Sequence, residues 1–267
     1  MMNLFPSACI WLDQSPIDEA LRRIKITAFH FIDAAPNTLD APASAKALKD
    51  LGLKVSCVVL DFNLPSGLSL DGNDEQARRK ALDHLKQALQ KCHSLGASVA
   101  YVGSCADRKR LDRFEQSVAE LAEQAARHGI KFCVEHAPGR ALPAAREALS
   151  FVEKVGHPNL YLLLDVGHTL LSKERAWEII EVAGKRIGYV QLNDNDGKKD
   201  RHWALLEGRL THEDLVKTIA ALKKIGYEGT LGLEIKPKPR TTLISDFSRN
   251  HNLIHRILID LEKQEKK

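Results

Sequence analysis

Three acids and one amide follow apolar stretches in the second half of the chain, at positions where buried strands would end. Glu135 follows the sequence FCV, Asp165 follows LYLLL, Gln191 follows IGYV and Glu234 follows LGL. A buried carboxylate is costly unless a partner compensates its charge, and three carboxylates gathered at one edge would repel one another. A divalent cation is the usual partner of such a group. The oxygen-rich set favours Mg²⁺, Mn²⁺ or a similar ion over a zinc–thiolate site.

A simpler interpretation is that each acid is a salt-bridge partner or a helix cap, which is the more frequent role of a lone acid at a strand end. Here acids follow three different strands, and a polar turn over residues 193–197 follows a fourth. Because coincidence is a poor explanation for all four, we predict a metal site.

The elements that must position these residues alternate in type along the chain. Eight short apolar segments are separated by longer helical patterns, which is typical of a parallel sheet covered on both faces. In the helical patterns, apolar residues recur every three or four positions, as in residues 77–92 and 114–125. The predicted strands are residues 8–12, 26–32, 54–61, 98–103, 131–135, 160–165, 188–193 and 230–235.

Helix boundaries carry the expected residue types. Proline and capping-box pairs favour the first turn of a helix, and glycine favours the position after its last turn. The predicted start signals are Pro16, Pro143 and the pair Thr211 and Asp214, and the predicted stop signals are Gly96, Gly129 and Gly226.

Eight strands alternating with helices can form an open doubly wound sheet or a closed barrel. The chain lacks the Gly-x-Gly-x-x-Gly turn and the Gly-x-x-x-x-Gly-Lys-Ser/Thr loop of nucleotide-binding open sheets. Eight strands close a barrel, and 267 residues is a normal length for one. No linker interrupts the series. We therefore predict a single α/β domain over residues 1–267, a (β/α)8 TIM barrel with its chemistry at the C-terminal ends of its strands.

Composition narrows the class of partner. The net charge is only +4, and its basic residues are scattered among acids, so no nucleic-acid partner is expected. No apolar stretch approaches the roughly 18 residues of a membrane span, and residues 1–12 lack the pattern of a signal peptide. The five cysteines form no Cys-x-x-Cys pair, which argues against a disulfide framework. The cytoplasm is the expected location.

The polar residues at the strand ends form an ordered series that resembles the xylose isomerase-like TIM barrels. That superfamily includes sugar-phosphate isomerases and epimerases, ketose 3-epimerases, hydroxypyruvate isomerases, inosose dehydratases and endonuclease IV enzymes. The motifs span residues 131–237, whereas the first hundred residues match only in their alternation of strands and helices. The motifs are Val134-Glu135-His136, Asp165-Val166-Gly167-His168, the sequence QLNDNDG from Gln191, Asp200-Arg201-His202, Glu207-Gly208 and Leu233-Glu234.

The resemblance implies a set of metal ligands. In the isomerase and epimerase branch, a Glu, an Asp, a His and a Glu from strands 5 to 8 hold the metal, and these places fall to Glu135, Asp165, Gln191 and Glu234. Gln191 departs from the pattern, because a His is expected three residues before Asp194. An amide oxygen ligates a hard cation but is a weaker ligand than imidazole for transition metals. The expected cofactor is one divalent ion: Mn²⁺, Mg²⁺, Co²⁺ or Zn²⁺.

The resemblance also implies a mechanism. The metal would stabilise the enediolate of an open-chain sugar, and Glu135 and Glu234 would act as the acid/base pair. The implied substrate is a sugar or a sugar phosphate. The residues expected to bind it are His168, His202, Arg201 and Lys236.

The endonuclease branch fits less well. Asp200-x-His202 followed by Glu207-Gly208 resembles a loop that holds an additional zinc in those enzymes. That branch also needs a metal-binding His after strands 3 and 4, where this chain has Asp61-Phe62-Asn63 and Gly103-Ser104-Cys105. A trinuclear cluster and cleavage at abasic sites are therefore not expected.

Two other functions use the same residues. A lyase would dehydrate a polyol ketone, and a non-catalytic sugar-binding protein would keep the barrel with a degenerate metal site, which Gln191 favours. The loops after the early strands, where the resemblance is weakest, are expected to select the sugar. Barrels of this type often pair, so a homodimer is the assembly to test.

Overall fold

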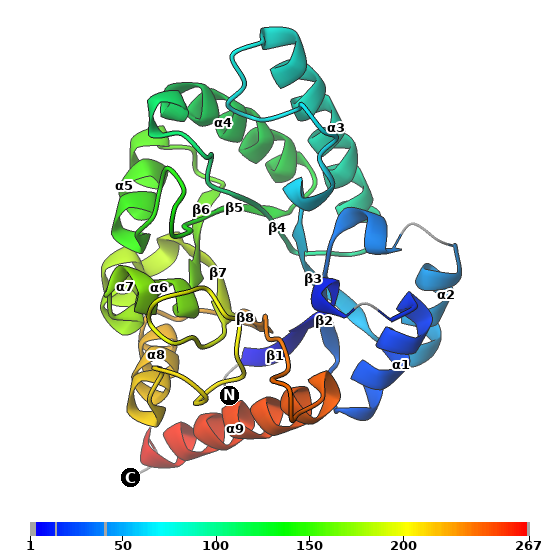
Figure 1. The fold of residues 1–267 in the computed structure, drawn as a ribbon, viewed down its shortest axis with the longest axis vertical. Helices are drawn as coiled ribbons and strands as arrows, with labels where there is room; N and C mark the ends of the chain where they lie inside the picture. The colour runs from blue at the N-terminus through cyan, green and yellow to red at the C-terminus, as the bar shows by residue number, and fades with distance from the viewer. Residues whose placement is uncertain (1–3, 14, 40–41, 266–267) are drawn as a thin grey trace.

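The computed structural model describes residues 4–13, 15–39 and 42–265. In this part of the chain, eight parallel strands close into a barrel in chain order, and β1 pairs with both β2 and β8. The helices form a ring around the strands, and the view along the barrel in Figure 1 shows both layers. The predicted (β/α)8 TIM barrel is confirmed. The predicted domain limits, residues 1 and 267, lie outside the described residues.

The elements have the following bounds in the described residues. The strands are β1 (Leu4–Cys9), β2 (Phe31–Ala34), β3 (Lys54–Val59), β4 (Val99–Gly103), β5 (Lys131–Glu135), β6 (Leu160–Asp165), β7 (Ile187–Leu192) and β8 (Gly229–Leu233). The helices are α1 (Ile17–Ile26), α2 (Pro42–Leu51), α3 (Glu75–Ser94), α4 (Leu111–Arg127), α5 (Ala145–Val155), α6 (Val166–Ser172), α7 (Ala176–Ala183), α8 (His212–Lys224) and α9 (Leu243–Glu265).

Two predicted strands were misplaced. The first was predicted at 8–12, but β1 ends at Cys9 and residues Ile10–Leu12 form a short 3₁₀ helix. Pro6 makes the true strand hard to recognise in the sequence, because proline cannot donate a hydrogen bond between strands and is rare inside them. The second was predicted at 26–32, but Ile26 is the last residue of α1 and the strand is Phe31–Ala34.

The predicted helix boundaries are largely correct. Pro16 is the N-cap of α1, and α5 begins at Ala145, just after Pro143. Thr211 and Asp214 form a reciprocal capping box at the start of α8. The three glycines predicted to end helices have left-handed backbone angles, with φ of +73° at Gly96, +68° at Gly129 and +69° at Gly226. Only glycine adopts this conformation without steric cost.

The apolar core has two parts. The larger part fills the space between the strands and the helix ring, and it includes the stripes of α3 and α4 that the sequence predicts. The smaller part fills the inside of the barrel with residues such as Cys57, Tyr101, Cys133, Leu163 and Tyr189. The barrel is therefore a packed core, and any reactive site must lie at its mouth.

One acid, Asp33 of β2, is buried inside the barrel. Its Oδ1 accepts a hydrogen bond from Ser7 Oγ at 2.6 Å and another from Ser56 Oγ. Its Oδ2 accepts one from Tyr189 OH at 2.6 Å and lies 3.4 Å from Cys9 Sγ. Burial raises the pKa of Asp33, and these hydrogen bonds oppose the rise. Four strands are thus tied together through one carboxyl group.

We expect Asp33→Ala to lower the free energy of unfolding by about 3 kcal/mol, because it leaves buried hydroxyl groups without their acceptor and creates a cavity. Urea denaturation followed by circular dichroism measures the change. The control, Tyr189→Phe, keeps the carboxyl group and removes one hydroxyl, which donates to Asp33 and accepts from Thr230 Oγ1, and it should cost about 1 kcal/mol. An Asp33→Ala protein as stable as the parent would mean that the network contributes nothing to the fold.

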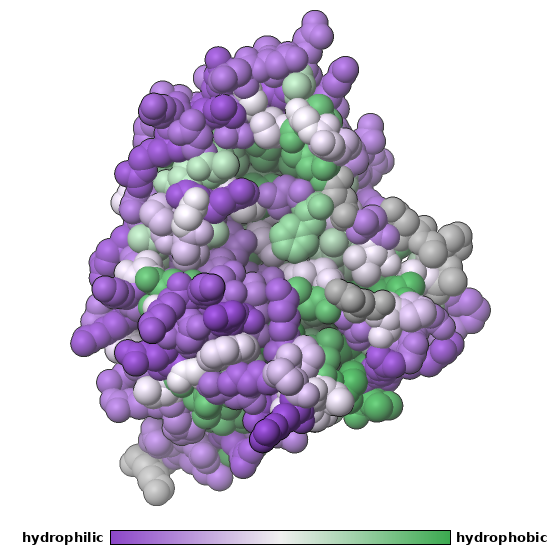
Figure 2. Space-filling view, viewed as in Figure 1, coloured by the Kyte–Doolittle hydropathy of each residue, from purple (hydrophilic) through white to green (hydrophobic). Residues whose placement is uncertain are grey.

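The face seen along the barrel is uneven in character. Hydrophilic side chains cover most of it, and hydrophobic side chains gather near its centre, beside a hollow (Figure 2). Among the residues that the structure describes, no helix is both long and apolar enough to cross a membrane.

Candidate metal centre

The predicted ligands lie together at the mouth of the barrel. Glu135 is the last residue of β5, Asp165 is the last of β6, Gln191 lies near the end of β7, and Glu234 follows β8. Alternate residues of a strand face the same side, and these four share the register of the side chains that fill the barrel. The sheet pairs Asp165 directly with Gln191.

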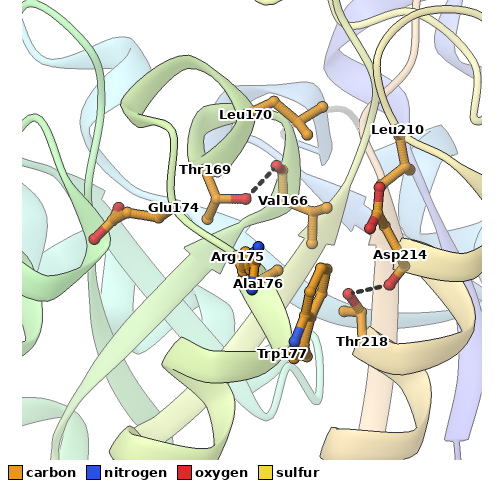
Figure 3. A pocket seen from close by; sticks show the side chains of 10 residues that line it. All are labelled: Val166, Thr169, Leu170, Glu174, Arg175, Ala176, Trp177, Leu210, Asp214 and Thr218. Carbon is orange, nitrogen blue, oxygen red and sulfur yellow. Dashed lines mark hydrogen bonds between the residues drawn. The ribbon is translucent and has the colours of Figure 1, made fainter.

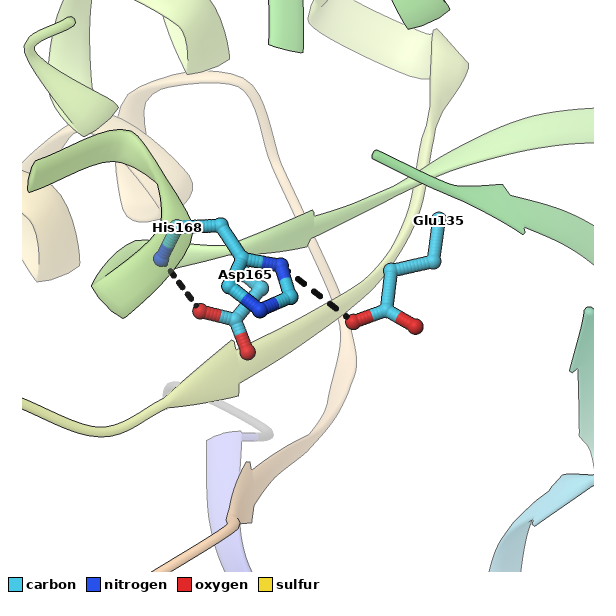
Figure 4. Close-up of side chains that lie close together, drawn as sticks. All are labelled: Glu135, Asp165 and His168. Atoms are coloured by element: carbon cyan, nitrogen blue, oxygen red, sulfur yellow. Dashed lines mark hydrogen bonds and ion pairs between the residues drawn. The ribbon is translucent and has the colours of Figure 1, made fainter. Parts of the chain in front are cut away.

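Glu135, Asp165 and His168 form a group of potential metal ligands among the described residues, with one ligand atom of each within 4.8 Å of the others. Figure 4 shows His168 between the two acids. Its backbone N–H donates to Asp165 Oδ1 at 2.8 Å, and its Nδ1 lies 3.5 Å from Glu135 Oε1.

The ring of His168 is nonetheless occupied by protein contacts. Nδ1 donates to the carbonyl oxygen of His136 at 2.8 Å, and Nε2 lies 3.2 Å from Asp200 Oδ2. A histidine that donates from both nitrogens has no lone pair left for a metal. The structure therefore favours His168 as a residue that orients the two acids rather than as a ligand.

Gln191 presents an open acceptor in the place where the family pattern has a histidine. Its Nε2 donates to Tyr101 OH at 3.1 Å, which directs the amide. Its Oε1 is buried and has no hydrogen-bond partner in the described part of the chain. An unpaired buried carbonyl oxygen is costly unless something occupies it. A hard cation is a suitable occupant.

Asp165 is held in place from two sides. His168 N–H binds Oδ1, and Asn193 Nδ2 donates to Oδ2 at 2.7 Å. Asn193 packs so tightly against Gly167 that a Cβ at that glycine would lie 1.7 Å from Asn193 Oδ1. The glycine of the Asp165-Val166-Gly167-His168 motif is therefore required for the carboxylate to be oriented.

Asp200 joins the two sides of the mouth. It lies on the loop between β7 and α8, and its Oδ2 is 3.2 Å from His168 Nε2 and 3.0 Å from His202 Nε2. His202 Nδ1 in turn lies 3.8 Å from Glu234 Oε2. His202 has a φ of +50°, a strained angle for a residue with a Cβ. Such strain persists where surrounding contacts over-determine the position, as they do here.

Charge in the centre is only partly compensated. Burial raises the pKa of Glu135 well above its usual value, and His168 opposes that rise. Burial also raises the pKa of Glu234. Burial would lower the pKa of His202, but Asp200 and Glu234 raise it to about 9.

The pKa of His168 is raised as well. Burial alone would lower its pKa, but Asp165 and Asp200 raise it well above its usual value. The fit to a cation rests on the donor atoms: Glu135, Asp165 and Glu234 offer carboxylate oxygens at one mouth, and Gln191 offers a buried amide oxygen without a hydrogen-bond partner in the described part of the chain. Such an oxygen-rich donor set fits a hard divalent cation.

Arg201 and Lys236 lie further out. Arg201 is exposed, and its Nε pairs with Asp196 Oδ2 at 3.1 Å. The side chain of Lys236 is also exposed, although its backbone N–H donates to the carbonyl oxygen of His202 at 2.5 Å. The structure brings His168 and His202 into the centre and places these two cations on its rim.

Two contacts of the centre were not predicted. Trp11, which follows β1, donates from Nε1 to Glu234 Oε1 at 3.0 Å. Asn193 binds Asp165 as described above. Asn193 lies two positions beyond the inward-facing Gln191, so the period of two was the available signal for it. Trp11 lies in the 3₁₀ helix after β1, where that period does not apply.

A separate pocket of about 210 Å³ lies in the helix ring between α6, α7 and α8. Figure 3 shows Trp177 beside Thr218 and Val166 in its wall, with hydrogen bonds that stay within single helices. None of the residues that line it belongs to the centre at the barrel mouth. We assign it no part in the chemistry.

The chain matches the family model of the xylose isomerase-like TIM barrels over residues 17–250, and it belongs to that family. The match covers every element from α1 to β8. The resemblance inferred from the motifs is thereby confirmed.

Individual relatives are distant. An L-ribulose 3-epimerase of Mesorhizobium japonicum is 24% identical over 237 residues, which cover 83% of this chain and 76% of the relative. A 2-oxo-tetronate isomerase of Pectobacterium atrosepticum is 25% identical over 218 residues, or 77% of this chain and 80% of the relative. A solved D-tagatose 3-epimerase-like protein superposes with a TM-score of 0.81 at 20% identity, covering 98% of this chain and 99% of that one.

Proposed function

We propose that the chain is a divalent-metal-dependent isomerase or epimerase of a sugar, which moves a proton at a carbon next to the carbonyl group. The observation that carries the proposal is the cluster of Glu135, Asp165 and Glu234 at one mouth, together with the open amide oxygen of Gln191. The relatives named for L-ribulose 3-epimerisation and 2-oxo-tetronate isomerisation support the same class.

Glu135, Asp165, Gln191 and Glu234 would hold the cation. When bound, a divalent cation polarises a carbonyl oxygen and stabilises the negative charge that develops as the neighbouring carbon loses its proton. The four ligand groups offer oxygen atoms only, which suits Mg²⁺ or Mn²⁺ better than a thiophilic ion.

Glu135 and Glu234 would move the proton. They come from β5 and from the end of β8, so they approach a substrate from different sides of the mouth. Trp11 fixes one oxygen of Glu234, and His168 and His202 lie beside the two acids. Because burial raises the pKa of both acids, each can hold a proton nearer to neutral pH than an exposed glutamate can.

Asp200 and its two histidines would orient the substrate. His202 Nδ1 has no hydrogen-bond partner in the described part of the chain and lies 3.8 Å from Glu234 Oε2, so it is the ring nitrogen available to a sugar oxygen. Both ring nitrogens of His168 contact protein groups, so His168 would act by holding Asp200 and the acids in place. Arg201 and Lys236 remain predicted substrate contacts at the rim.

A non-catalytic sugar-binding protein is the second candidate, and the observation that favours it is Gln191 in place of the expected histidine. A dehydratase is a variant of the first proposal, because it would use the same acids and cation.

Solvent-hydrogen exchange tests these functions together. The purified protein is incubated in D₂O with each of Mg²⁺, Mn²⁺, Co²⁺ and Zn²⁺ and a panel of ketoses, and the sugars are analysed by mass spectrometry. We expect deuterium to enter a ketose and an epimer or isomer to appear. A product lighter by one water would indicate a dehydratase. Binding of a sugar without any deuterium exchange would indicate a non-catalytic sugar-binding protein and would refute the isomerase proposal.

A further inference from the structure

A second hollow, with a volume of about 320 Å³, opens next to the metal centre on the side of β3 and β4. Its wall consists of residues 64–71 from the connection between β3 and α3, residues 103–106 at the end of β4, and the side chains of Asp61, Phe114 and Arg140. The volume lies at the lower end of the roughly 300–1,000 Å³ typical of small-molecule sites. We call this hollow the β3–β4 cleft.

The β3–β4 cleft adjoins the reacting groups. Gly103, in its wall, pairs with Glu135 in the sheet, and the backbone N–H of Ser104, also in its wall, donates to the carbonyl oxygen of Glu135 at 3.1 Å. A substrate held at the centre would therefore extend into the β3–β4 cleft with its remote carbons.

The wall of the cleft contains two polar atoms that nothing satisfies in the described part of the chain. Ser104 is fully buried, and its Oγ has no hydrogen-bond partner. Asp61 Oδ2 accepts the backbone N–H of Gly103 at 3.1 Å, but the buried Asp61 Oδ1 has no partner. Native proteins rarely leave such atoms unpaired unless a ligand or water completes them. Two of them in one cleft indicate a polar ligand.

Arg140 supplies donors beside these atoms. Its Nε donates to the carbonyl oxygen of Ser104 at 3.0 Å, which fixes the guanidinium group at the cleft. A Cβ built on Gly103 would lie 3.6 Å from Asp61 Oδ2 and 3.9 Å from Arg140 Nη2. The acid and the guanidinium group thus flank a glycine whose missing side chain leaves room between them.

The charges of the cleft select against an anion. The charged residues in its wall are Asp61, Asp71 and Arg140, and Asp71 is almost fully buried. A phosphate or carboxylate would meet two acids and a single cation. Hydroxyl groups suit the wall better, because each can donate to a carboxylate and accept from the guanidinium group.

We propose that the β3–β4 cleft binds the uncharged, hydroxyl-rich end of the substrate sugar, with Asp61, Ser104 and Arg140 as the residues that determine specificity. The inference rests on the proposed function, since it assigns the remote end of the same substrate. The preferred substrate is then an unphosphorylated ketose long enough to reach the cleft.

The experiment compares substrates that share the reacting carbons and differ at the remote end. D-Fructose, L-ribulose, D-fructose 6-phosphate and dihydroxyacetone are assayed by deuterium uptake with the Mn²⁺-loaded full-length protein. We expect at least a tenfold higher kcat/KM for an unphosphorylated ketose than for the 6-phosphate. Ser104→Ala and Arg140→Gln should each raise the KM for that ketose at least tenfold and leave exchange into dihydroxyacetone unchanged.

The matched control is Arg146→Gln, which removes an exposed arginine on α5, outside the cleft, and should change neither substrate. Circular dichroism confirms that each variant is folded. A preference for the 6-phosphate, or variants with the parental KM for the long ketose, would overturn the inference and leave the proposed function intact. Exchange into no ketose at all would instead overturn the proposed function, and this inference with it.

Discussion

Replacing Glu135 by Gln is expected to abolish turnover, and so is replacing Glu234 by Gln, while the barrel stays folded. Glutamine keeps the size of the side chain and an oxygen that can face a cation, but it cannot take up or release a proton. Acid–base groups typically contribute about 10²–10⁴-fold to a rate, so each variant should lose at least about 10³-fold in kcat. Deuterium uptake by the best ketose measures the loss.

The control is Glu153→Gln on the exposed face of α5, which has the same chemistry far from the mouth and should keep full activity. Metal content is measured on the same samples, because a variant that has lost its ion would be inactive for a different reason. Near-normal activity in both Glu135→Gln and Glu234→Gln would remove these residues from the proton transfer.

The later strands could be predicted closely from the sequence. β5 and β6 have the predicted bounds, because each is a continuous apolar segment that ends at a single acid. The first two strands failed for opposite reasons. Pro6 breaks the apolar pattern of β1, and the apolar end of α1 at Ile26 resembles the start of a strand. Burial on both faces gives a clear pattern, whereas an amphipathic helix beside a short strand does not.

The candidate site likewise has a part that the sequence predicts and a part that it does not. Strand ends and a period of two suffice to bring the acids of β5, β6 and β8 to one mouth. The contacts that orient them are not local: Trp11 and Glu234 are 223 residues apart in the chain. Asp200 sits between two histidines only because the loop after β7 folds back over the mouth with His202 at a strained angle. No spacing rule predicts such a loop conformation.

We expect the protein to bind about one divalent ion per chain and the Glu135→Ala, Asp165→Ala double variant to bind none. The carboxyl groups at the mouth outnumber the histidines, and Gln191 Oε1 has no hydrogen-bond partner in the described part of the chain. A bound cation would balance the negative charge and occupy that oxygen. Elemental analysis after purification without chelators, and again after incubation with Mn²⁺, Mg²⁺, Co²⁺ or Zn²⁺, measures the content.

The variant Gln191→His tests whether the parent protein binds its metal weakly or has lost metal binding altogether. Because imidazole is the better ligand for transition metals, this variant should bind Co²⁺ and Zn²⁺ more tightly than the parent and Mg²⁺ less tightly. Glu153→Gln, on the exposed face of α5, is the control and should leave metal binding unchanged. An ion bound only by Gln191→His would mean that the parent has lost its metal and acts by binding sugar. No ion in either protein would refute the metal centre, because neither the acids nor a restored histidine would then have held one.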